Sequence, residues 1–510
     1  MGMRCIPKSA PFLAGLALTL GGLFCIPLRA QQAGVDVMGS PIPGITAHGH
    51  HAMGVNPSLL ATERPFQDRE DWRNPPDSLT RKGLKAWKRS QRLRFFSGVE
   101  GGVVLRSPVL DGTPLVQWAG GERTWTLSER RALAEQMGQA PTVADAQMRW
   151  AGWSRHGQRG GWAWTVEDRY SATAAPSPLL ASFVMLGPAS DVYDAVQLSN
   201  GNIVPVQELT DAQFELAESG IRNNGEVLAL ELLGGSRFAV QHVRSYGAGF
   251  GIKLVNTRAL TVGGGLAARY YRGTGYYEVD ADNRTAFAAF NQGFGAELVA
   301  PNATLGSALR PAGFGVALDL AVRIDVADVW FASLAVTEVG SMDWQGESYS
   351  LNNPVASLGD WASQEGGALD LLNEGLSPSA LFVEATPERR VVDLPTRVRL
   401  NGGMRLGGRA LVGVELSAPV NDALLRQPSE VGVGARAPFG PVLAMGGMRW
   451  RDGRGWSTPV ALVWSPKKGQ AQFGLATDDL FGWLAPERRW GWGWSYTRTL
   501  FPARGLEEGK

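Results

Sequence analysis

Histidine is scarce in this chain of 510 residues, and three of its five copies stand close together. They are His48, His50 and His51 in the segment AHGHHAM, where two imidazoles and a nearby carboxylate could bind a divalent metal. Closed zinc sites need three or four well-spaced ligands, however, and the neighbouring glycines favour a solvated loop. We therefore expect no metal and no cofactor; the alternative is that this segment folds into a plug with its imidazoles facing water.

The other two histidines, His156 and His242, are the remaining candidates for a catalytic base. A hydrolase needs a nucleophile beside such a base. His156 lies in SRHGQRGG and His242 in FAVQHVRS, and neither segment contains a recognisable nucleophile motif. The sequence therefore predicts that the protein is not an enzyme.

Charged and apolar side chains alternate in GVALDLAVRID, in TRVRLNGGMRL and in the segment from Ala410 to Ser417. Alternation with a period of two places the two kinds on opposite faces of a strand, one suited to lipid and the other to a wet lumen. The charges on the predicted inward faces are Asp319, Arg323, Asp325, Arg397, Arg399, Arg405 and Glu415. We expect them to pair with one another or with a plug, because an unpaired buried ion costs several kcal/mol. A structural network is favoured over a role in guiding a ligand.

The segment RWGWGWSYTRTLF near the C-terminus carries four large aromatics on one face of a predicted strand: Trp490, Trp492, Trp494 and Tyr496. A soluble strand could not expose this ladder to water, whereas a bilayer accepts it, so we predict a lipid-facing strand of an outer-membrane barrel. Arg489, Gly491, Trp494 and Tyr496 also match the pattern by which final barrel strands are recognised. We accordingly expect barrel-assembly machinery and outer-membrane lipid as partners, although a tail, 502–510, follows the strand.

Similar alternation recurs from about residue 92 to residue 501, and turn residues separate the runs. At roughly 25 to 30 residues for each strand with its connection, this span predicts an all-β fold, an antiparallel transmembrane barrel of about 14 strands. Three short inserts look helical, starting at Leu127, Leu209 and Leu358. The alternative is a secreted, non-membrane β-sandwich or propeller.

The N-terminal segment has the layout of a cleavable secretory signal, with Arg4 and Lys8 before an apolar run and a cleavage site near Ala30. Both cysteines, Cys5 and Cys25, would be removed with the signal segment, so we expect disulfides to contribute nothing to the stability of the mature chain. Residues 31–91 are rich in Pro, Gly and charge and read as a plug or periplasmic segment. No later window is long and apolar enough for a transmembrane helix, and any insertion must use strands.

The overall charge excludes one class of function. Lys and Arg number 49 against 48 Asp and Glu, so no net charge attracts nucleic acid. The 65 glycines and 18 tryptophans instead suit alternating strands with tight bends and an apolar outer face.

Several segments, taken together and in order, resemble a known group of proteins. AHGHHAMGVNPSLLA, with Asn56 and Pro57, is similar to the N-terminal Asn-Pro-Ala plug motif of FadL-type outer-membrane barrels and their PorV-type relatives, with Ser58 in place of the usual Ala. The segments beginning at Trp164, Phe250, Leu266, Ala335 and Leu394 resemble a largely uncharacterised branch of that superfamily. The series covers nearly the whole mature chain.

The resemblance implies a monomeric barrel of about fourteen strands with an N-terminal plug, in the outer membrane of a two-membrane bacterium. It also implies passive passage of small hydrophobic molecules, with movement of the plug around Asn56 and Pro57 opening a route through the lumen or sideways through the wall. The alternative is a PorV-like anchor or scaffold for a surface or secretion complex, without transport.

Overall fold

The computed structural model describes residues 39–47, 49–62, 94–106, 126–139, 141–156, 159–257, 259–291, 311–327, 329–355, 381–406, 410–421, 428–452, 455–465, 471–481 and 489–500. The signal segment, the tail at 502–510, His48 and the helix predicted from Leu358 lie outside these ranges.

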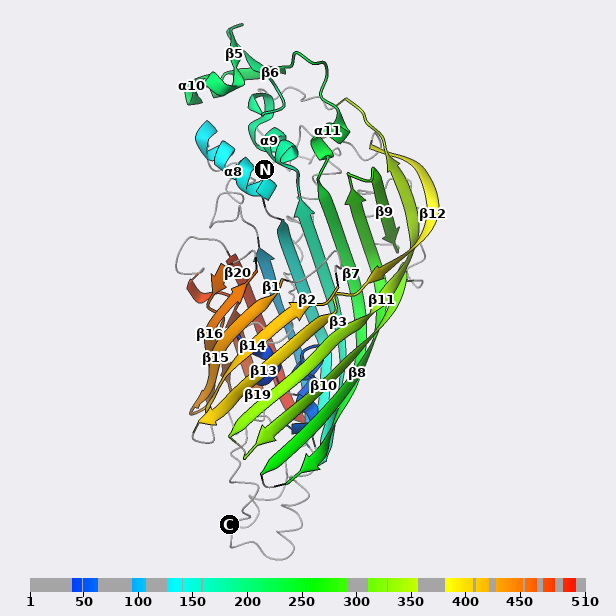
Figure 1. Ribbon diagram of the computed structural model, residues 1–510, viewed down its shortest axis with the longest axis vertical. Helices are drawn as coiled ribbons and strands as arrows, with labels where there is room; N and C mark the ends of the chain where they lie inside the picture. Colours follow the sequence, from blue (N-terminus) through cyan, green and yellow to red (C-terminus); the bar gives the residue numbers. More distant parts are fainter. Residues whose placement is uncertain are drawn as a thin grey trace, which may run out of the picture.

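Within the described residues, fourteen strands close into one antiparallel barrel (Figure 1). Each strand pairs with the next around the ring, and the first, β1, also pairs with the last, β20. In ring order they are β1 (Arg94–Arg106), β2 (Thr142–His156), β3 (Gly160–Ala175), β7 (Arg237–Asn256), β8 (Leu260–Asp280), β10 (Gly313–Val326), β11 (Trp330–Leu351), β13 (Arg397–Leu406), β14 (Ala410–Pro419), β15 (Glu430–Phe439), β16 (Val442–Arg451), β18 (Val460–Trp464), β19 (Ala471–Thr477) and β20 (Arg489–Leu500). The predicted fold class and strand number are confirmed.

The outer face of the barrel is apolar, as the period-two pattern predicts. On β10, the outward side chains at alternate positions from Phe314 to Ile324 are 41 to 55% exposed, while Asp319 and Arg323 between them are fully buried. Exposed apolar residues continue around the wall, including Phe250, Ile252, Leu400, Val414, Val433, Leu462 and Leu475. Such a continuous band is costly in water and suits the hydrocarbon of a bilayer.

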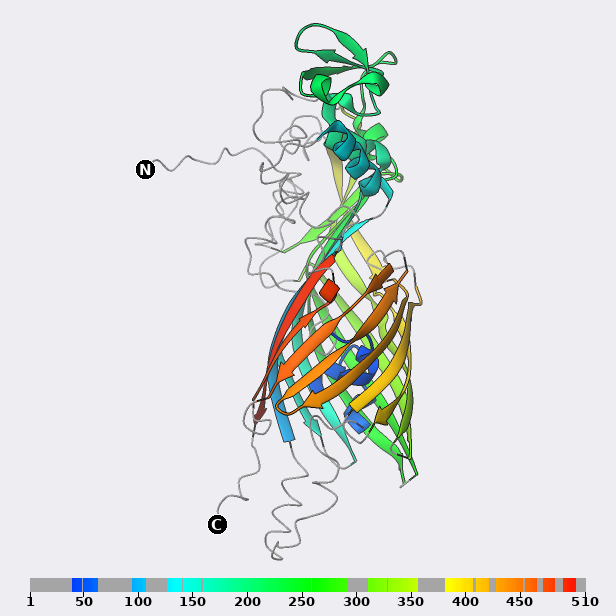
Figure 2. The ribbon, with the colours of Figure 1, turned by 90° about the vertical axis from the view of Figure 1, so that its left-hand side faces the viewer.

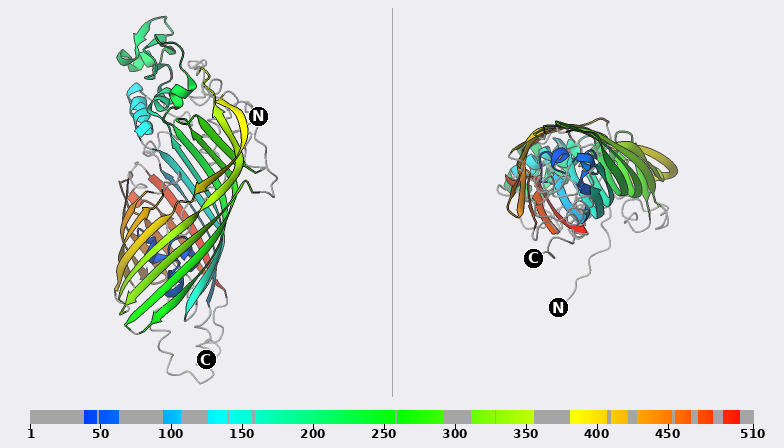
Figure 3. Two further views of the ribbon diagram at one scale, coloured as in Figure 1. Left: turned by 45° about the vertical axis from the view of Figure 1, so that its right-hand side comes forward. Right: turned by 90° about the horizontal axis from the view of Figure 1, so that it is seen from below.

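One side of the wall is much taller than the other (Figures 1 and 3). Strands β7, β8 and β11 have 20 to 22 residues, whereas β13 to β16 have 10 each. Above β10, strand β9 (Thr285–Phe290) takes its place between β8 and β11, and above β13, strand β12 (Phe382–Asp393) pairs with β11. Because about 9 to 11 residues of a tilted strand suffice to cross a bilayer, β7, β8 and β11 are about twice as long as a membrane wall requires. A short strand, β17 (Gly455–Ser457), pairs with the end of β16.

A small lobe covers the top of the tall side (Figure 1). It contains α8 (Leu127–Gln139), α9 (Pro178–Leu186), η2 (Gly187–Ala189), β4 (Ala195–Leu198), β5 (Ile203–Pro205), η3 (Val206–Glu208), α10 (Asp211–Phe214), β6 (Ala217–Ile221) and α11 (Ala229–Leu233). Helix α9 begins where Ser177 caps it and Pro178 fixes its first turn. No helix of the described residues is both long and apolar enough to cross a membrane.

The helix predicted from Leu127 is confirmed as α8, but the one predicted from Leu209 is wrong beyond its first turn. Thr210 forms a capping box with Gln213, and the helix then ends at Phe214. Residues Ala217–Ile221 instead form β6, because they pair with β4 in a three-stranded sheet. Nearby, hydrogen bonds from the Arg222 guanidinium lower the pKa of the Glu231 carboxyl and tie β6 to α11.

A segment near the N-terminus lies inside the ring of strands, where it is drawn in blue (Figure 2). We call residues 39–47 and 49–62 the inner segment. It contains α3 (Pro43–Thr46), η1 (Gly49–Ala52) and α4 (Leu59–Thr62). Ile42 and Ile45 pack on Phe331 and Leu411 of the wall. Met53, Leu59 and Leu60 share a second buried cluster with the wall residues Ala163 and Ala267.

Candidate functional site

The side chain of Asn56 is fully buried between the inner segment and the wall. Its Nδ2 donates to the carbonyl oxygen of Gly44 at 2.9 Å and to Oγ of Ser333 on β11 at 3.1 Å. Its Oδ1 accepts from the backbone N–H of Ser58 at 3.2 Å and from the Ser58 hydroxyl at 2.5 Å. A single amide therefore braces two turns of the inner segment and attaches them to the barrel.

Pro57, the other residue of the predicted motif, lies on the lumen side of Gly265 of β8, with its backbone against the Gly265 Cα. A Cβ on Gly265 would overlap the Pro57 carbonyl carbon, so only a glycine lets the two backbones approach this closely. Gly432 faces the backbone of Pro41 in the same way, and Gly251 faces that of Ala61. Gly402 and Gly403 differ, because a Cβ on either would meet Phe331 or Val412 of the adjacent strands and not the inner segment.

Glu415 connects the inner segment to a buried ion pair. Its Oε1 lies 2.7 Å from Nη1 of Arg399, and its Oε2 accepts the backbone N–H of Gly44 at 2.7 Å. Two more wall arginines reach the same segment: Arg449 donates to the Ser40 carbonyl and Arg436 to the Thr46 carbonyl. The polar backbone of the inner segment is thus held by charged groups of the wall.

Asp319 belongs to a second group of buried charges. Its Oδ2 binds Nη2 of Arg269 at 2.6 Å, and its Oδ1 accepts the backbone N–H of Glu338 at 2.8 Å. The Glu338 carboxylate accepts from Arg169 at 2.7 Å, from Arg269 at 3.1 Å and from the Tyr271 hydroxyl at 3.0 Å. Glu338 has φ +59°, which a non-glycine residue rarely adopts, so these bonds hold a strained bulge in β11.

The remaining charges on the predicted inward faces form two clusters. Arg323 and Arg405 both bind Asp325, at 3.1 and 2.8 Å, and both guanidinium groups stack on the ring of Phe331. Arg397 donates to the Ser417 hydroxyl and to the Pro428 carbonyl. Sequence reasoning missed several partners in these networks, because they come from strands far away along the chain: Arg169, Arg269, Glu338, Glu430, Arg449, Arg451 and Asp478.

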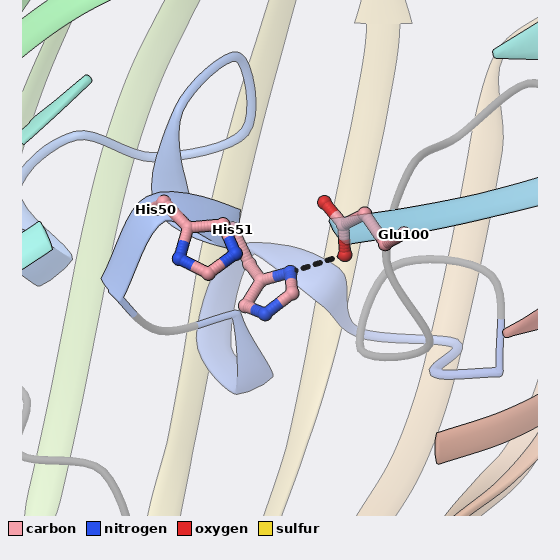
Figure 4. A group of neighbouring side chains, drawn as sticks. All are labelled: His50, His51 and Glu100. Carbon is pink, nitrogen blue, oxygen red and sulfur yellow. Dashed lines mark ion pairs between the residues drawn. The ribbon is translucent and has the colours of Figure 1, made fainter. Parts of the chain in front are cut away.

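His50 and His51 do not lie in a solvated loop; that expectation is wrong. They belong to η1 and are 1% and 4% exposed, because the inner segment packs against the inner face of the wall, where the His50 ring covers Gly98 of β1 and Gly152 of β2. Their rings lie 4.2 Å apart, and Nδ1 of His51 lies 2.6 Å from Oε2 of Glu100 on β1 (Figure 4). Glu100 also pairs with Arg149 of β2, which binds Glu167 of β3 at 3.0 Å.

The two other histidines lie far from this cluster in the chain, but His156 is close to the inner segment, since a Cβ on Gly49 would lie 4.0 Å from its Nε2. His156 ends β2 and is 8% exposed. His242 stacks on Tyr170 at 3.8 Å on the outer face, two residues from Arg244. Arg244 binds Asp168 with two hydrogen bonds, and Trp150 donates a third at 2.6 Å. Asp168 therefore interrupts the apolar face of β3, as its sequence pattern indicates, with its charge fully paired.

The aromatic ladder of β20 is half-buried on the outer face. Trp492, Trp494 and Tyr496 alternate with the buried Gly491, Gly493 and Thr497. Tyr496 packs on Phe473 of β19 at 5.0 Å, which accounts for part of the burial of its own ring. The side chain of Trp490 lies outside the described residues.

A hollow of about 400 Å³ opens on the apolar outer face over β7, β8, β10 and β11. Its sides include Phe250, Ile252, Leu320 and Leu334, and Gly264 and Gly265 contribute to its lining. Since Pro57 lies directly behind Gly265, only the backbone of β8 separates the hollow from the inner segment.

Comparisons with known proteins give structural similarity without close sequence relationship. No family description and no curated protein matches the chain. Among solved structures, the Pseudomonas putida toluene transporter TodX is 9% identical, with 90% of this chain and 96% of that chain covered and a TM-score of 0.37. The Ralstonia pickettii toluene transporter TbuX is 10% identical, with 90% and 96% covered and a TM-score of 0.38. A Pseudomonas aeruginosa FadL homologue is 10% identical, with 93% and 99% covered and a TM-score of 0.39.

The assignment of the fold rests on the strand pairing of this chain itself. The pairing is continuous around the ring, and it closes between β1 and β20 over twelve paired positions from Phe95 to Arg106. This chain is a closed β-barrel.

Proposed function

We propose that this protein spans an outer membrane and passes small hydrophobic molecules passively across it, with the inner segment as the plug. The observation that carries the proposal is the apolar hollow on the outer wall with Pro57 directly behind it. An apolar solute that passes sideways through the wall beside β8 would meet the apolar side chains of the hollow and then lipid at this place. The inner segment is held by hydrogen bonds that can be broken and remade, which suits a plug that moves.

The lengths of the connections support an orientation. The wall begins at Arg94 and ends at Leu500 on the same edge, where the connections are short, such as 257–259, 327–329 and 440–441. Long connections, including the lobe between β3 and β7, lie at the opposite edge. Outer-membrane barrels have short periplasmic turns and longer extracellular loops, so we place the lobe outside the cell.

We further propose that the barrel works as a monomer surrounded by outer-membrane lipid and folds with the help of barrel-assembly machinery. The ladder of Trp492, Trp494 and Tyr496 supports the lipid contact, since amphipathic aromatics favour the membrane interface.

The proposal is tested by uptake in cells that lack their own channels for apolar solutes. Cells with and without the protein are given a labelled long-chain fatty acid and a small apolar aromatic compound as probes. Faster uptake of either probe, lost when a disulfide between cysteines at Asn56 and Ser333, whose side chains touch at 3.1 Å, fixes the inner segment to the wall and regained on reduction, supports passage. Equal uptake with and without the protein, at confirmed expression, contradicts it.

The lobe favours a second candidate, an anchor for a surface or secretion complex. It has a core of its own, with Leu127, Met185, Val196 and Phe214, and it stands on strands that rise past the low side of the wall. Ile203 and Leu216 are 63% and 44% exposed on it. A partner protein that remains bound through detergent extraction, and leaves when the lobe is deleted, would favour this role over transport.

A further inference from the structure

We propose that His50, His51 and Glu100 bind a divalent transition-metal ion of the zinc type inside the barrel. One ligand atom from each residue lies within 4.8 Å of the other two. Three atoms so placed have a common point within about 2.8 Å of each, roughly 0.6 to 0.8 Å more than metal bonds to nitrogen and oxygen of about 2.0 to 2.2 Å. Metal binding therefore needs side-chain shifts of this size, and it needs Nδ1 of His51 and Oε2 of Glu100, now 2.6 Å apart, to separate. Two imidazoles and one carboxylate form a ligand set that zinc uses, with solvent completing the coordination.

The site is built and enclosed. The three residues are 1%, 4% and 0% exposed. The ring of His50 lies against Gly98 of β1 and Gly152 of β2, and a Cβ on Gly98 would come within 2.8 Å of its Cε1 and Nε2. Glycines on both neighbouring strands thus make the space that this imidazole occupies, and they fix it beside His51.

The surrounding groups orient the carboxylate. Arg149 binds Oε1 of Glu100, so Oε2 faces Nδ1 of His51 at 2.6 Å (Figure 4). Arg149 is itself shared with Glu167. Glu167 in turn lies near Arg169 and Arg269. The Oε2 atom of Glu100, turned toward His51, is therefore the oxygen that a bound cation would meet. Metal-bound carboxylates commonly carry such a second hydrogen-bonding partner.

The ligands come from two different parts of the protein. His50 and His51 belong to the inner segment, and Glu100 belongs to wall strand β1. A bound metal would therefore fasten the inner segment to the barrel. This consequence rests on the proposed function of that segment as a plug, whereas metal binding itself does not.

The competing occupant is a proton on His51, which would form an ion pair with Glu100, and metal analysis separates the two. The mature chain is purified in detergent through a peptide tag without histidines, stripped with EDTA, incubated with Zn²⁺ and desalted. We expect about one zinc per chain in the wild type, as three ligands and a solvent molecule require. Co²⁺ loaded in the same way should give a visible absorption spectrum.

Three single variants and one double variant decide the assignment. His51→Ala and Glu100→Gln should lose the zinc and the cobalt spectrum, while His242→Ala, which changes a histidine on the outer face, should keep both. A shift in gel mobility on boiling shows that each variant is folded. A wild type without zinc, or a folded Glu100→Gln/His51→Ala double variant with wild-type zinc content, overturns the metal site. If the wild type takes up the probes but binds no zinc when loaded, the metal site alone is overturned. If it binds zinc but takes up neither probe, only the proposed function is overturned.

Discussion

Nδ2 of Asn56 donates a hydrogen bond to Oγ of Ser333 across the boundary between the inner segment and strand β11, at 3.1 Å. The same nitrogen binds the Gly44 carbonyl, and Oδ1 binds Ser58, so the amide is satisfied on all sides. A buried group that loses its partner costs about 1 to 3 kcal/mol, and several groups depend on this one side chain.

Asn56→Ala is expected to loosen the inner segment by roughly 3 kcal/mol, because it removes the partners of Gly44, Ser58 and Ser333 at once. Single-channel recording in a planar bilayer should show more frequent and longer ion-conducting events than the wild type. Ser333→Ala is the matched control, since it removes one of the four bonds and should have a smaller effect. A larger effect of Ser333→Ala than of Asn56→Ala would contradict the bracing role of the amide.

Adjacent glycines of β8 offer a second comparison. Gly265→Ala places a methyl group against the backbone of Pro57, while Gly264→Ala points outward and meets only Leu254, at 3.5 Å. Overpacking of a tight contact costs about 1 to 3 kcal/mol, so Gly265→Ala should displace the inner segment. Limited proteolysis should then cut the inner segment faster in Gly265→Ala than in Gly264→Ala, and equal rates would argue against the close approach.

A charge on the apolar outer face should prevent stable insertion. Leu320 is 53% exposed in the middle of β10, and Ile203 is 63% exposed on the lobe. An arginine facing lipid at the centre of a barrel wall costs about 2 to 4 kcal/mol. We expect Leu320→Arg to lower the amount of folded protein in the membrane and Ile203→Arg to leave it unchanged; equal amounts would place β10 outside the hydrocarbon.

The proposed orientation can be read by labelling with a membrane-impermeant maleimide. Both native cysteines lie in the predicted signal segment, so single cysteines can be introduced at Asn200 in the lobe and at Pro441 in a short turn, both exposed. In intact cells we expect Asn200→Cys to react and Pro441→Cys to react only after the outer membrane is permeabilised. The reverse labelling pattern would contradict the proposed orientation of the barrel.

The sequence predicted the wall well because alternation is a local property. In β10, β13 and β20, residues two positions apart lie on the same face of the strand, so the apolar and polar faces can be identified from the sequence alone. The resemblance of the Asn56–Pro57 segment to a plug motif likewise predicted an N-terminal segment inside the barrel, and the structure places this segment in the lumen. What this segment does there stays a prediction.

The rest depended on contacts between distant residues. Trp344 is fully buried and stacks on Tyr276 at 5.1 Å in the tall part of the sheet, where alternation gives no exposed face. Arg269 and Glu338 meet although 69 residues separate them. Glu100, the wall residue beside His51, lies in a run of apolar residues and glycines and has no local signal for its role.

Gel mobility of the protein in urea-washed membranes, before and after boiling, tests the closed membrane barrel most directly. A barrel closed between β1 and β20 resists the detergent until it is heated, so the unboiled sample should migrate as a compact species, distinct from the boiled one. Identical mobility of the two samples, with the protein released from the membranes by urea, would contradict a closed barrel in the bilayer.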